Sequence, residues 1–583
     1  MKKNILIFLF LAIHATVCAQ YYLRGEVKDE KNSPLSNARI RLHSTGYIYY
    51  SGNGGSFGIT TSRKIDSVTI QLEGYHPLAL QLDATKYQAI TLKTLYASAD
   101  IRKNRLLSFT KNLKPEDRKN WNSTGETYSS QVENEFVNSK KYPETGFAIH
   151  TDKAAYSNIR RFLNMGTTVP ADAVRIEELL NYFNFGYKAP EKDSVFAFDS
   201  YYSDCPWNAN NQLLFLNVSA KKIAPEKIPP SNLVFLIDVS GSMDMPNRLP
   251  LLKSAFKLLV DNLREKDTIS IVVYGSTTGV WLVPTSGKEK EKIRKAIEEL
   301  NPVGATPGES GIRSAYRVAK SQFIPNGNNR VILATDGDFN IGQSTEDELE
   351  KLITQHQQSG IYLTCLGVGM GNYKDSKLEV LAKKGNGNFA YLDNEKEAEK
   401  VLVKELTQTL YTVADDAYLN IHFNPDIVSE YRLIGYDNKL KALADTLSEV
   451  EGGEVGSGLS LLAIFELSAP FGTMETFNHR DALARVVVHY KHPADSTRRV
   501  STYSCTSELT EFSELPACHQ FAASVTMFAL LIKESKYAKR FSWNDAILLA
   551  HQSHDAKDPL QAEFVAMIEK AKKIYSRKRK RLR

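Results

Sequence analysis

The stretch that decides the fold is NLVFLIDVSGSMDM, residues 232–245. Its aliphatic and aromatic residues run without interruption up to Asp238, which predicts a strand buried on both faces. Ser240 and Ser242 follow at alternate positions, so an extended chain would point all three side chains to one side, with Val239 facing the core. A buried strand that ends in a carboxylate and two hydroxyls could hold a nucleophile, a phosphate or a cation.

Strand and helix patterns alternate around this stretch, over residues 229–408. Apolar segments such as TISIVVYG, NRVILATDG and IYLTCLGVG are separated by amphipathic segments such as LPLLKSAFKLLVDNL and ESGIRSAYRVAKSQF. Apolar strands between amphipathic helices predict a parallel sheet covered on both faces, in a doubly wound, Rossmann-like α/β domain. In such sheets, ligands bind at the carboxyl ends of the strands, which is where Asp238 is expected.

Two further segments bring oxygen ligands to the same edge of the predicted sheet. Thr306 lies in the loop PVGATPGES, and Asp336 follows the buried strand VILAT. The candidate metal ligands are two carboxylates and three hydroxyls: Asp238, Ser240, Ser242, Thr306 and Asp336. Such a set suits Mg²⁺, which prefers six oxygens at about 2.1 Å, with Mn²⁺ or Ca²⁺ as alternatives. Because neutral hydroxyl ligands leave positive charge on a divalent ion, we expect a carboxylate of a partner to complete the site.

The order D-x-S-x-S, a loop threonine and a strand-end T-D-G resembles the metal-ion-dependent adhesion site (MIDAS) of von Willebrand factor type A (VWA) domains. The five candidate ligands match that motif at the expected places in the strand order. The resemblance implies that the three hydroxyls coordinate the metal directly, and that Asp238 and Asp336 often do so through water. It also implies a domain that binds a protein ligand presenting Asp or Glu.

The segments on either side of the α/β domain indicate a more specific family. AAYSNIRRFLN, DAVRIEELLNYF, CPWN, GNGNFAYLD and SEYRLIGYDN resemble bacterial proteins of the YfbK type, in which a VWA domain sits between dedicated flanking regions. We therefore expect an N-terminal flank over residues 141–228 and a separate C-terminal α+β region over residues 409–575. The N-terminal flank carries two helical patterns, with Thr151 and Asp172 as capping candidates.

Residues 20–96 show short alternating strands broken by turns, which predicts a small β-sandwich. The order Gly25, Val27 and Asp29, with the turn residues that follow, resembles the carboxypeptidase regulatory-like domain. In the family it resembles, this module is a spacer or adhesion unit without an active site. Residues 97–140 are polar and lack a sustained apolar period, so they predict a linker. The whole chain is therefore expected to be multidomain.

The beginning of the chain predicts export. Two lysines precede an apolar run, and Val17-Cys18-Ala19 places small residues where a signal peptidase cleaves. We expect a signal peptide over residues 1–19 and a mature protein in the periplasm or at the cell surface. Lipidation of Cys18 is the alternative, although the residues before it do not fit a lipoprotein signal.

The remaining cysteines and the charge distribution give weaker indications of function. Four cysteines follow the signal peptide, and their spacing fits neither a disulfide framework nor a zinc site, although Cys505 and Cys518 could form one disulfide. The net charge of +6 comes from the C-terminus, because residues 570–583 carry nine bases and no acid. A basic tail over residues 576–583 is either a solvated helix end or a contact for anionic lipid or polysaccharide. Nothing in the sequence predicts a nucleic-acid partner or an oligomeric state.

These features predict an exported, non-enzymatic binding or adhesion protein that captures an acidic group of a protein partner through Mg²⁺. One alternative is an envelope scaffold or assembly factor with a structural or vestigial metal site, and another is a hydrolase. A serine hydrolase would need a G-x-S-x-G elbow and a histidine partner. The first glycine is missing, and the one histidine of the α/β domain, His356, follows a solvent-facing helix pattern. A P-loop motif is absent. Two histidine pairs are a further metal-site alternative, His489 with His492 and His551 with His554.

Overall fold

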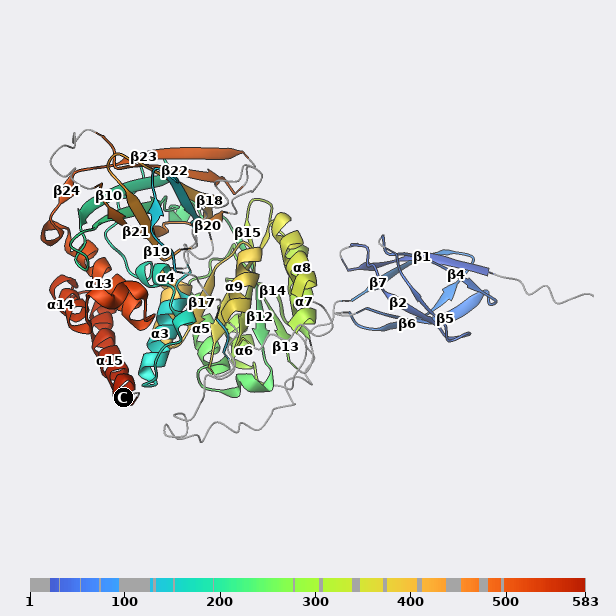
Figure 1. Ribbon diagram of the computed structural model, residues 1–583. Helices are drawn as coiled ribbons and strands as arrows, with labels where there is room; N and C mark the ends of the chain where they lie inside the picture. The colour runs from blue at the N-terminus through green and yellow to red at the C-terminus, as the bar shows by residue number, and fades with distance from the viewer. Residues whose placement is uncertain are drawn as a thin grey trace, which may run out of the picture. The chain divides into compact units, whose positions relative to one another are not determined.

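The computed structural model describes residues 21–30, 32–52, 54–72, 75–93, 126–128, 133–149, 152–191, 193–275, 278–302, 308–337, 346–370, 375–405, 411–436, 452–470, 481–493 and 497–581. The predicted signal peptide, with Cys18, and the candidate residues Thr151 and Thr306 lie outside these residues. The chain forms two compact units, and the N-terminal unit is described by itself (Figure 1).

The N-terminal unit is built from two small sheets. One has the strand order β4-β1-β7 and the other the order β3-β2-β5-β6. The strands are β1 (Tyr21–Asp29), β2 (Arg39–Leu42), β3 (Ile48–Tyr50), β4 (Ser56–Thr61), β5 (Ile65–Gln71), β6 (Leu78–Asp83) and β7 (Tyr87–Leu92). Both sheets contribute to one core, which includes Val27, Ile40 and Val68. This region is therefore β-rich as predicted, and its assignment to the carboxypeptidase regulatory-like domain remains a prediction.

The central α/β domain contains a six-stranded sheet of order β14-β13-β12-β15-β16-β17. Its strands are β12 (Ser231–Asp238), β13 (Thr268–Tyr274), β14 (Gly279–Ser286), β15 (Asn328–Thr335), β16 (Ile361–Val368) and β17 (Phe389–Leu392). β12 pairs in parallel with β13 on one side and β15 on the other, and every residue of β12 is buried. The α/β sheet predicted from the alternating pattern is confirmed.

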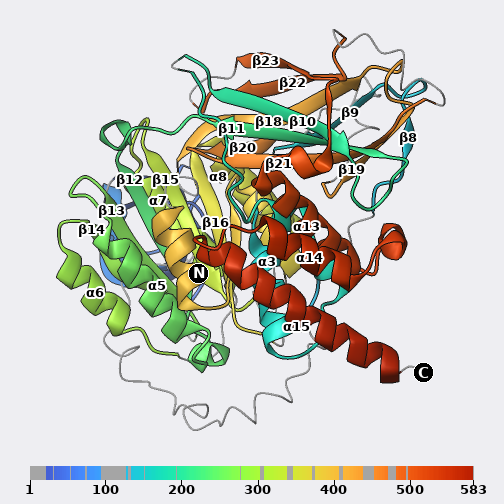
Figure 2. The same cartoon turned by 90° about the vertical axis from the view of Figure 1, so that its left-hand side faces the viewer.

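Helices cover both faces of this sheet (Figures 1 and 2). α5 packs against α6 and α10, whereas α8 packs against α9. The helices are η4 (Gly241–Asp244), α5 (Leu249–Asp261), α6 (Lys290–Glu298), α7 (Gly308–Ser321), α8 (Glu346–Gln358), α9 (Asp375–Lys384), α10 (Glu395–Glu399) and the π-helical turn η5 (Lys400–Lys404). Because β13, β12, β15, β16 and β17 are parallel, their carboxyl ends meet at one edge.

The two flanks of the central domain share their sheets. The first sheet, of order β24-β10-β11-β21-β19-β8, joins β10 (Phe196–Asp204) and β11 (Gln212–Ala220) to β21 (Ser460–Ser468) and β19 (Glu430–Ile434). In the second sheet, of order β20-β18-β22-β23, β9 pairs with β18. The remaining strands are β8 (Val137–Asn138), β9 (Glu144–Ala148), β18 (Thr412–Phe423), β20 (Gly453–Gly456), β22 (Ala484–Lys491), β23 (Arg498–Cys505) and β24 (Leu509–Thr510). The sequence predicted a separate C-terminal region, and this prediction is wrong, because the region shares both sheets with the N-terminal flank. The linker predicted over residues 97–140 also contains a strand, β8.

The helices of the flanks match the sequence patterns in part. α3 (Ala154–Asn164) fits the first pattern, but the second divides into η2 (Ala171–Ala173) and α4 (Ile176–Leu180). Asp172 lies inside η2, and α4 begins without a side-chain cap, so the capping role predicted for Asp172 is wrong. The other helices are η3 (Pro225–Lys227), η6 (Phe512–Glu514), α13 (Ala517–Ile532), η7 (Lys536–Arg540), α14 (Trp543–Ser553) and α15 (Pro559–Arg581). The predicted basic tail thus continues α15 as far as residue 581.

The structure also bears on the predicted disulfide and on membrane-spanning helices. Cys505 is buried and Cys518 is half-buried, and both are free thiols, so the disulfide considered from their spacing is not formed. Among the described residues, no helix has the length and apolar character needed to cross a bilayer.

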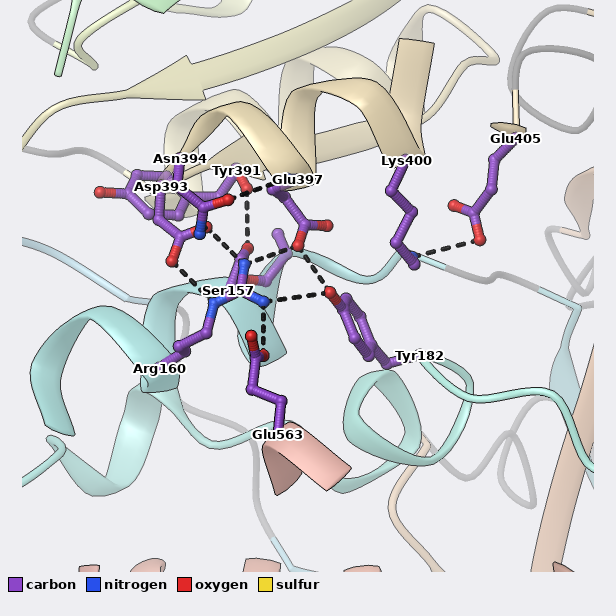
Figure 3. A network of polar contacts seen from close by, with 11 residues as sticks. Ser157, Arg160, Tyr182, Tyr391, Asp393, Asn394, Glu397, Lys400, Glu405 and Glu563 are labelled. Atoms are coloured by element: carbon purple, nitrogen blue, oxygen red, sulfur yellow. Dashed lines mark hydrogen bonds and ion pairs between the residues drawn. The ribbon is translucent and has the colours of Figure 1, made fainter. Parts of the chain in front are cut away.

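A buried guanidinium ties the central domain to both flanks (Figure 3). Arg160 of α3 donates to Asp393, directly after β17, from Nε at 2.8 Å and from Nη2 at 2.5 Å. Its Nη2 also donates to Glu397 of α10 at 2.7 Å, and its Nη1 to Glu563 of α15 at 2.8 Å. Figures 1 and 2 both show α15 beside α3. The side chains of Arg160 and Asp393 are each 6% exposed, so the ion pair is shielded from water.

We expect Arg160→Ala to lower the free energy of unfolding by about 3–5 kcal/mol, because it leaves buried carboxylates without a counter-charge. Urea unfolding of the full chain measures the change. Arg294→Ala is the control, since Arg294 also pairs with more than one carboxylate, those of Asp261 and Glu291, but on the surface. That variant should unfold nearly as the wild type does. Equal effects of the two substitutions would contradict a special role for the buried pair.

Candidate metal centre

Strand β12 places the carboxylate of Asp238 at the carboxyl edge of the central sheet. Asp238 is the last residue of β12 and is paired in register with Tyr274, the last residue of β13. Tyr274 donates its hydroxyl to Asp238 Oδ2 at 3.1 Å, and Thr335, the last residue of β15, donates to the same atom at 3.0 Å. The two neighbouring strands therefore fix this carboxylate in place.

Burial gives Asp238 an unusual electrostatic environment. The residue is 1% exposed. Burial raises the pKa of Asp238 to about 6, and the nearby negative charge of Asp336 adds to the rise, while hydrogen bonds from Ser240 and Thr335 oppose it. A buried carboxylate of this kind is more stable beside a positive charge, so the position favours a cation.

Ser240 and Ser242 follow the strand as its chain turns into η4. The backbone N–H of Ser240 donates to Asp238 Oδ1 at 2.8 Å, which holds the turn against the end of the strand. The two serine Oγ atoms lie 3.0 Å apart. Ser240 is half-buried and Ser242 is exposed, so these hydroxyls lie nearer to solvent than the carboxylate does. Val239 is 2% exposed and packs into the core, as its place in the pattern predicts.

The donor set and its spacing fit a small divalent cation. Two adjacent vertices of an octahedron with metal–oxygen bonds of about 2.1 Å are about 3.0 Å apart, whereas the longer bonds of Ca²⁺ require about 3.3–3.7 Å. The separation of the serine Oγ atoms, 3.0 Å, matches the first value. At the same separation the two hydroxyls form a hydrogen bond with each other, and the donor set as a whole fits a divalent cation.

Asp336 directly follows β15 and is 3% exposed. Its Oδ2 accepts a hydrogen bond at 2.5 Å from Nη1 of Arg248, a residue at the start of α5. Sequence reasoning missed Arg248. The signal was present, because a basic side chain at a helix N-cap is unfavourable next to the helix dipole unless an acidic group balances it. Sequence reasoning also missed Tyr274 and Thr335. Their hydroxyls reach Asp238 only because β13 and β15 pair with β12 in this register, which the sequence alone does not give.

The structure places four of the five predicted ligands together. Asp238, Ser240, Ser242 and Asp336 lie at the carboxyl ends of β12 and β15, and Thr306 lies outside the described residues. Within the described residues, no group of three or more His, Cys, Asp or Glu side chains could hold a metal. A metal site at this edge would therefore depend on the serine hydroxyls as well as on the two carboxylates.

The histidines considered from the sequence have other surroundings. His356 stacks on Tyr316 with ring centroids 4.2 Å apart, and burial lowers its pKa to about 4. The solvent-facing position predicted for His356 is therefore wrong. His489 stacks on Tyr418, and His551 Nε2 lies 3.0 Å from Glu569 Oε1.

Comparison with known proteins gives a consistent result along most of the chain. Three family models match: von Willebrand factor over residues 122–215, von Willebrand factor type A domain over residues 232–407, and Uncharacterized protein YfbK, C-terminal, over residues 408–574. The protein YfbK of Escherichia coli (strain K12) is 36% identical over 458 residues, which cover 74% of this chain and 78% of that protein.

Other similar proteins have lower sequence identity to this chain. Inter-alpha-trypsin inhibitor heavy chain H2 of Sus scrofa is 29% identical over 175 residues, 28% of this chain but 18% of that protein. Among solved structures, a von Willebrand factor type A protein from Catenulispora acidiphila aligns at 16% identity with a TM-score of 0.38, over 63% of this chain and 89% of that chain. The extent of the match to the Escherichia coli protein, with the VWA and C-terminal models on either side of residue 408, shows that this chain belongs to the YfbK family of VWA-domain proteins.

Proposed function

We propose that the protein is an exported binding protein whose VWA domain holds Mg²⁺ at a MIDAS and captures a carboxylate of a protein partner. VWA domains generally mediate protein–protein interaction and commonly bind a divalent metal at this motif. The observation that carries the proposal is the donor set at the carboxyl ends of β12 and β15, where the hydroxyls of Ser240 and Ser242 lie beside the buried carboxylate of Asp238.

The MIDAS resemblance and the contacts of Asp238 support two roles for the residues of the site. The hydroxyls of Ser240 and Ser242, with that of Thr306, would coordinate the ion directly. Both Oδ atoms of Asp238 already accept hydrogen bonds within the protein, which favours contact with the ion through water. When bound, the ion would supply a Lewis-acidic centre that attracts an anionic oxygen.

A hydrolytic role has less support from the same contacts. A serine nucleophile needs a base within hydrogen-bond reach. In the described part of the chain, the hydroxyl of Ser240 contacts that of Ser242, and the domain's histidine, His356, is on α8 against Tyr316. We therefore propose binding and not catalysis.

We expect Asp238→Asn to weaken Mg²⁺ binding by about tenfold to one hundredfold, because it removes a charge next to the ion without changing the side chain's size. Isothermal titration of the mature full chain gives the affinity. Asp261→Asn is the matched control, since Asp261 carries the same charge at the far end of α5 and on the surface. Thr306→Ala should also weaken binding, by less than Asp238→Asn does, if its hydroxyl coordinates the ion only in the liganded state, as the resemblance implies. Equal affinities of wild type and Asp238→Asn, with both folded by circular dichroism, would show that these oxygens do not form a metal site.

We expect capture of partners from a native envelope extract to require the metal and both serine hydroxyls. The wild type in Mg²⁺ should retain proteins that the wild type in EDTA, and the Ser240→Ala/Ser242→Ala variant in Mg²⁺, do not retain. Mass spectrometry of the eluates identifies the difference. Capture that survives both treatments would favour the alternative of a scaffold with a structural or vestigial metal site.

We also propose that the protein acts outside the cytoplasm, because its first residues fit a signal peptide. N-terminal analysis of the native protein should find residue 20 at the start of the mature chain. Retention of Met1 would contradict export, and a lipid on Cys18 would favour the lipoprotein alternative.

A further inference from the structure

Arg248 connects the three loops at the carboxyl ends of β12, β15 and β16. Its Nη1 donates to the backbone carbonyl of Ser242 at 2.7 Å as well as to Asp336 Oδ2, and its Nη2 donates to the carbonyl of Met370 at 2.8 Å. The side chain of Arg248 is 7% exposed. One buried guanidinium therefore contacts both the loop that carries the serine hydroxyls and the second carboxylate of the candidate site.

The fold makes specific room for this guanidinium. Gly369, after β16, has a φ of +81°, and a Cβ at this position would lie 2.5 Å from Arg248 Nε and 2.9 Å from its Cγ. A side chain at residue 369 would thus both strain the backbone and displace Arg248. Arg248 is also the N-cap residue of α5, where a positive charge is disfavoured by the helix dipole. Its position depends on Asp336 and the two carbonyls.

The charge of Arg248 changes the balance at the metal centre. Asp238 and Asp336 alone would neutralise a divalent ion, but Arg248 pairs with Asp336 and adds the positive charge of its guanidinium. With a divalent ion bound, the two carboxylates, the guanidinium and the ion together carry one net positive charge. Because Arg248 is buried, salt and water screen this charge only weakly.

We propose that Arg248 is a specificity-determining residue of this site, because its charge makes tight metal binding depend on a carboxylate supplied by the ligand. The proposal rests on the proposed function and deepens it. A bound carboxylate cancels the remaining positive charge, so metal and carboxylate each strengthen the binding of the other. By linkage, the factor by which the carboxylate raises metal affinity equals the factor by which the metal raises carboxylate affinity.

The test measures this factor with simple probes. The mature full chain is titrated with Mn²⁺, and the free Mn²⁺ is read by electron paramagnetic resonance. Each titration is made in chloride and then in acetate at the same ionic strength. Acetate should raise the Mn²⁺ affinity of the wild type by about tenfold. In Arg248→Gln this gain should fall to about twofold or less, because the ion is already neutralised.

Two further variants separate charge from geometry. Arg248→Lys keeps the charge but loses the planar fork that contacts the three loops, so it should keep most of the acetate gain. It also provides the test if Arg248→Gln does not fold. Lys257→Gln removes one positive charge from the exposed surface of α5, where Lys257 pairs with Glu298, and should behave as the wild type does.

The outcomes distinguish this inference from the proposed function. Absence of Mn²⁺ binding in the wild type would overturn the metal site itself. Mn²⁺ binding with no acetate gain in the wild type would overturn the role of Arg248 and leave the metal site standing. The same would follow from an equal gain in wild type and Arg248→Gln, or from a gain that is lost in Arg248→Lys.

Discussion

The burial of β12 is the constraint on which the rest of the central domain depends. Every residue of this strand is buried between β13 and β15, so the strand can present a charged group only where it ends. Asp238 is that end, and the hydroxyls of Tyr274 and Thr335 satisfy its oxygen from the two neighbouring strands. The same parallel pairing that forms the core therefore also fixes the position of the carboxylate.

Buried guanidinium groups connect the VWA domain to its two flanking regions. Arg160 reaches the end of the central sheet from α3, and Arg175, before α4, pairs with Asp375 of α9. Arg330 of β15 pairs in the same way with Glu454 of β20. In each pair the charged groups lose their hydration on burial and form directed hydrogen bonds with each other. These bonds favour one relative position of the two elements that carry the charges. These pairs involve the strands and helices of the VWA domain away from Asp238.

The sequence predicted the features that depend on neighbouring residues. The apolar run before Asp238 and the alternate serines predicted both the strand and the turn, because burial and side-chain direction follow from local periodicity. The contacts of Arg248 with Asp336 and Met370 have no such local pattern, since they join loops after three different strands. The capping role assigned to Asp172 failed for a different reason, because η2 interrupts the helical pattern within the segment itself.

The shared sheets of the two flanks have a consequence for how the chain folds. β11 pairs with β21, although the whole VWA domain lies between them in the sequence. During synthesis, β10 and β11 emerge long before their partner, with an unpaired strand edge. The VWA domain has all its own strands by residue 392 and can fold first. Its folding brings the two flanks closer together and shortens the loop that must close before β11 and β21 meet.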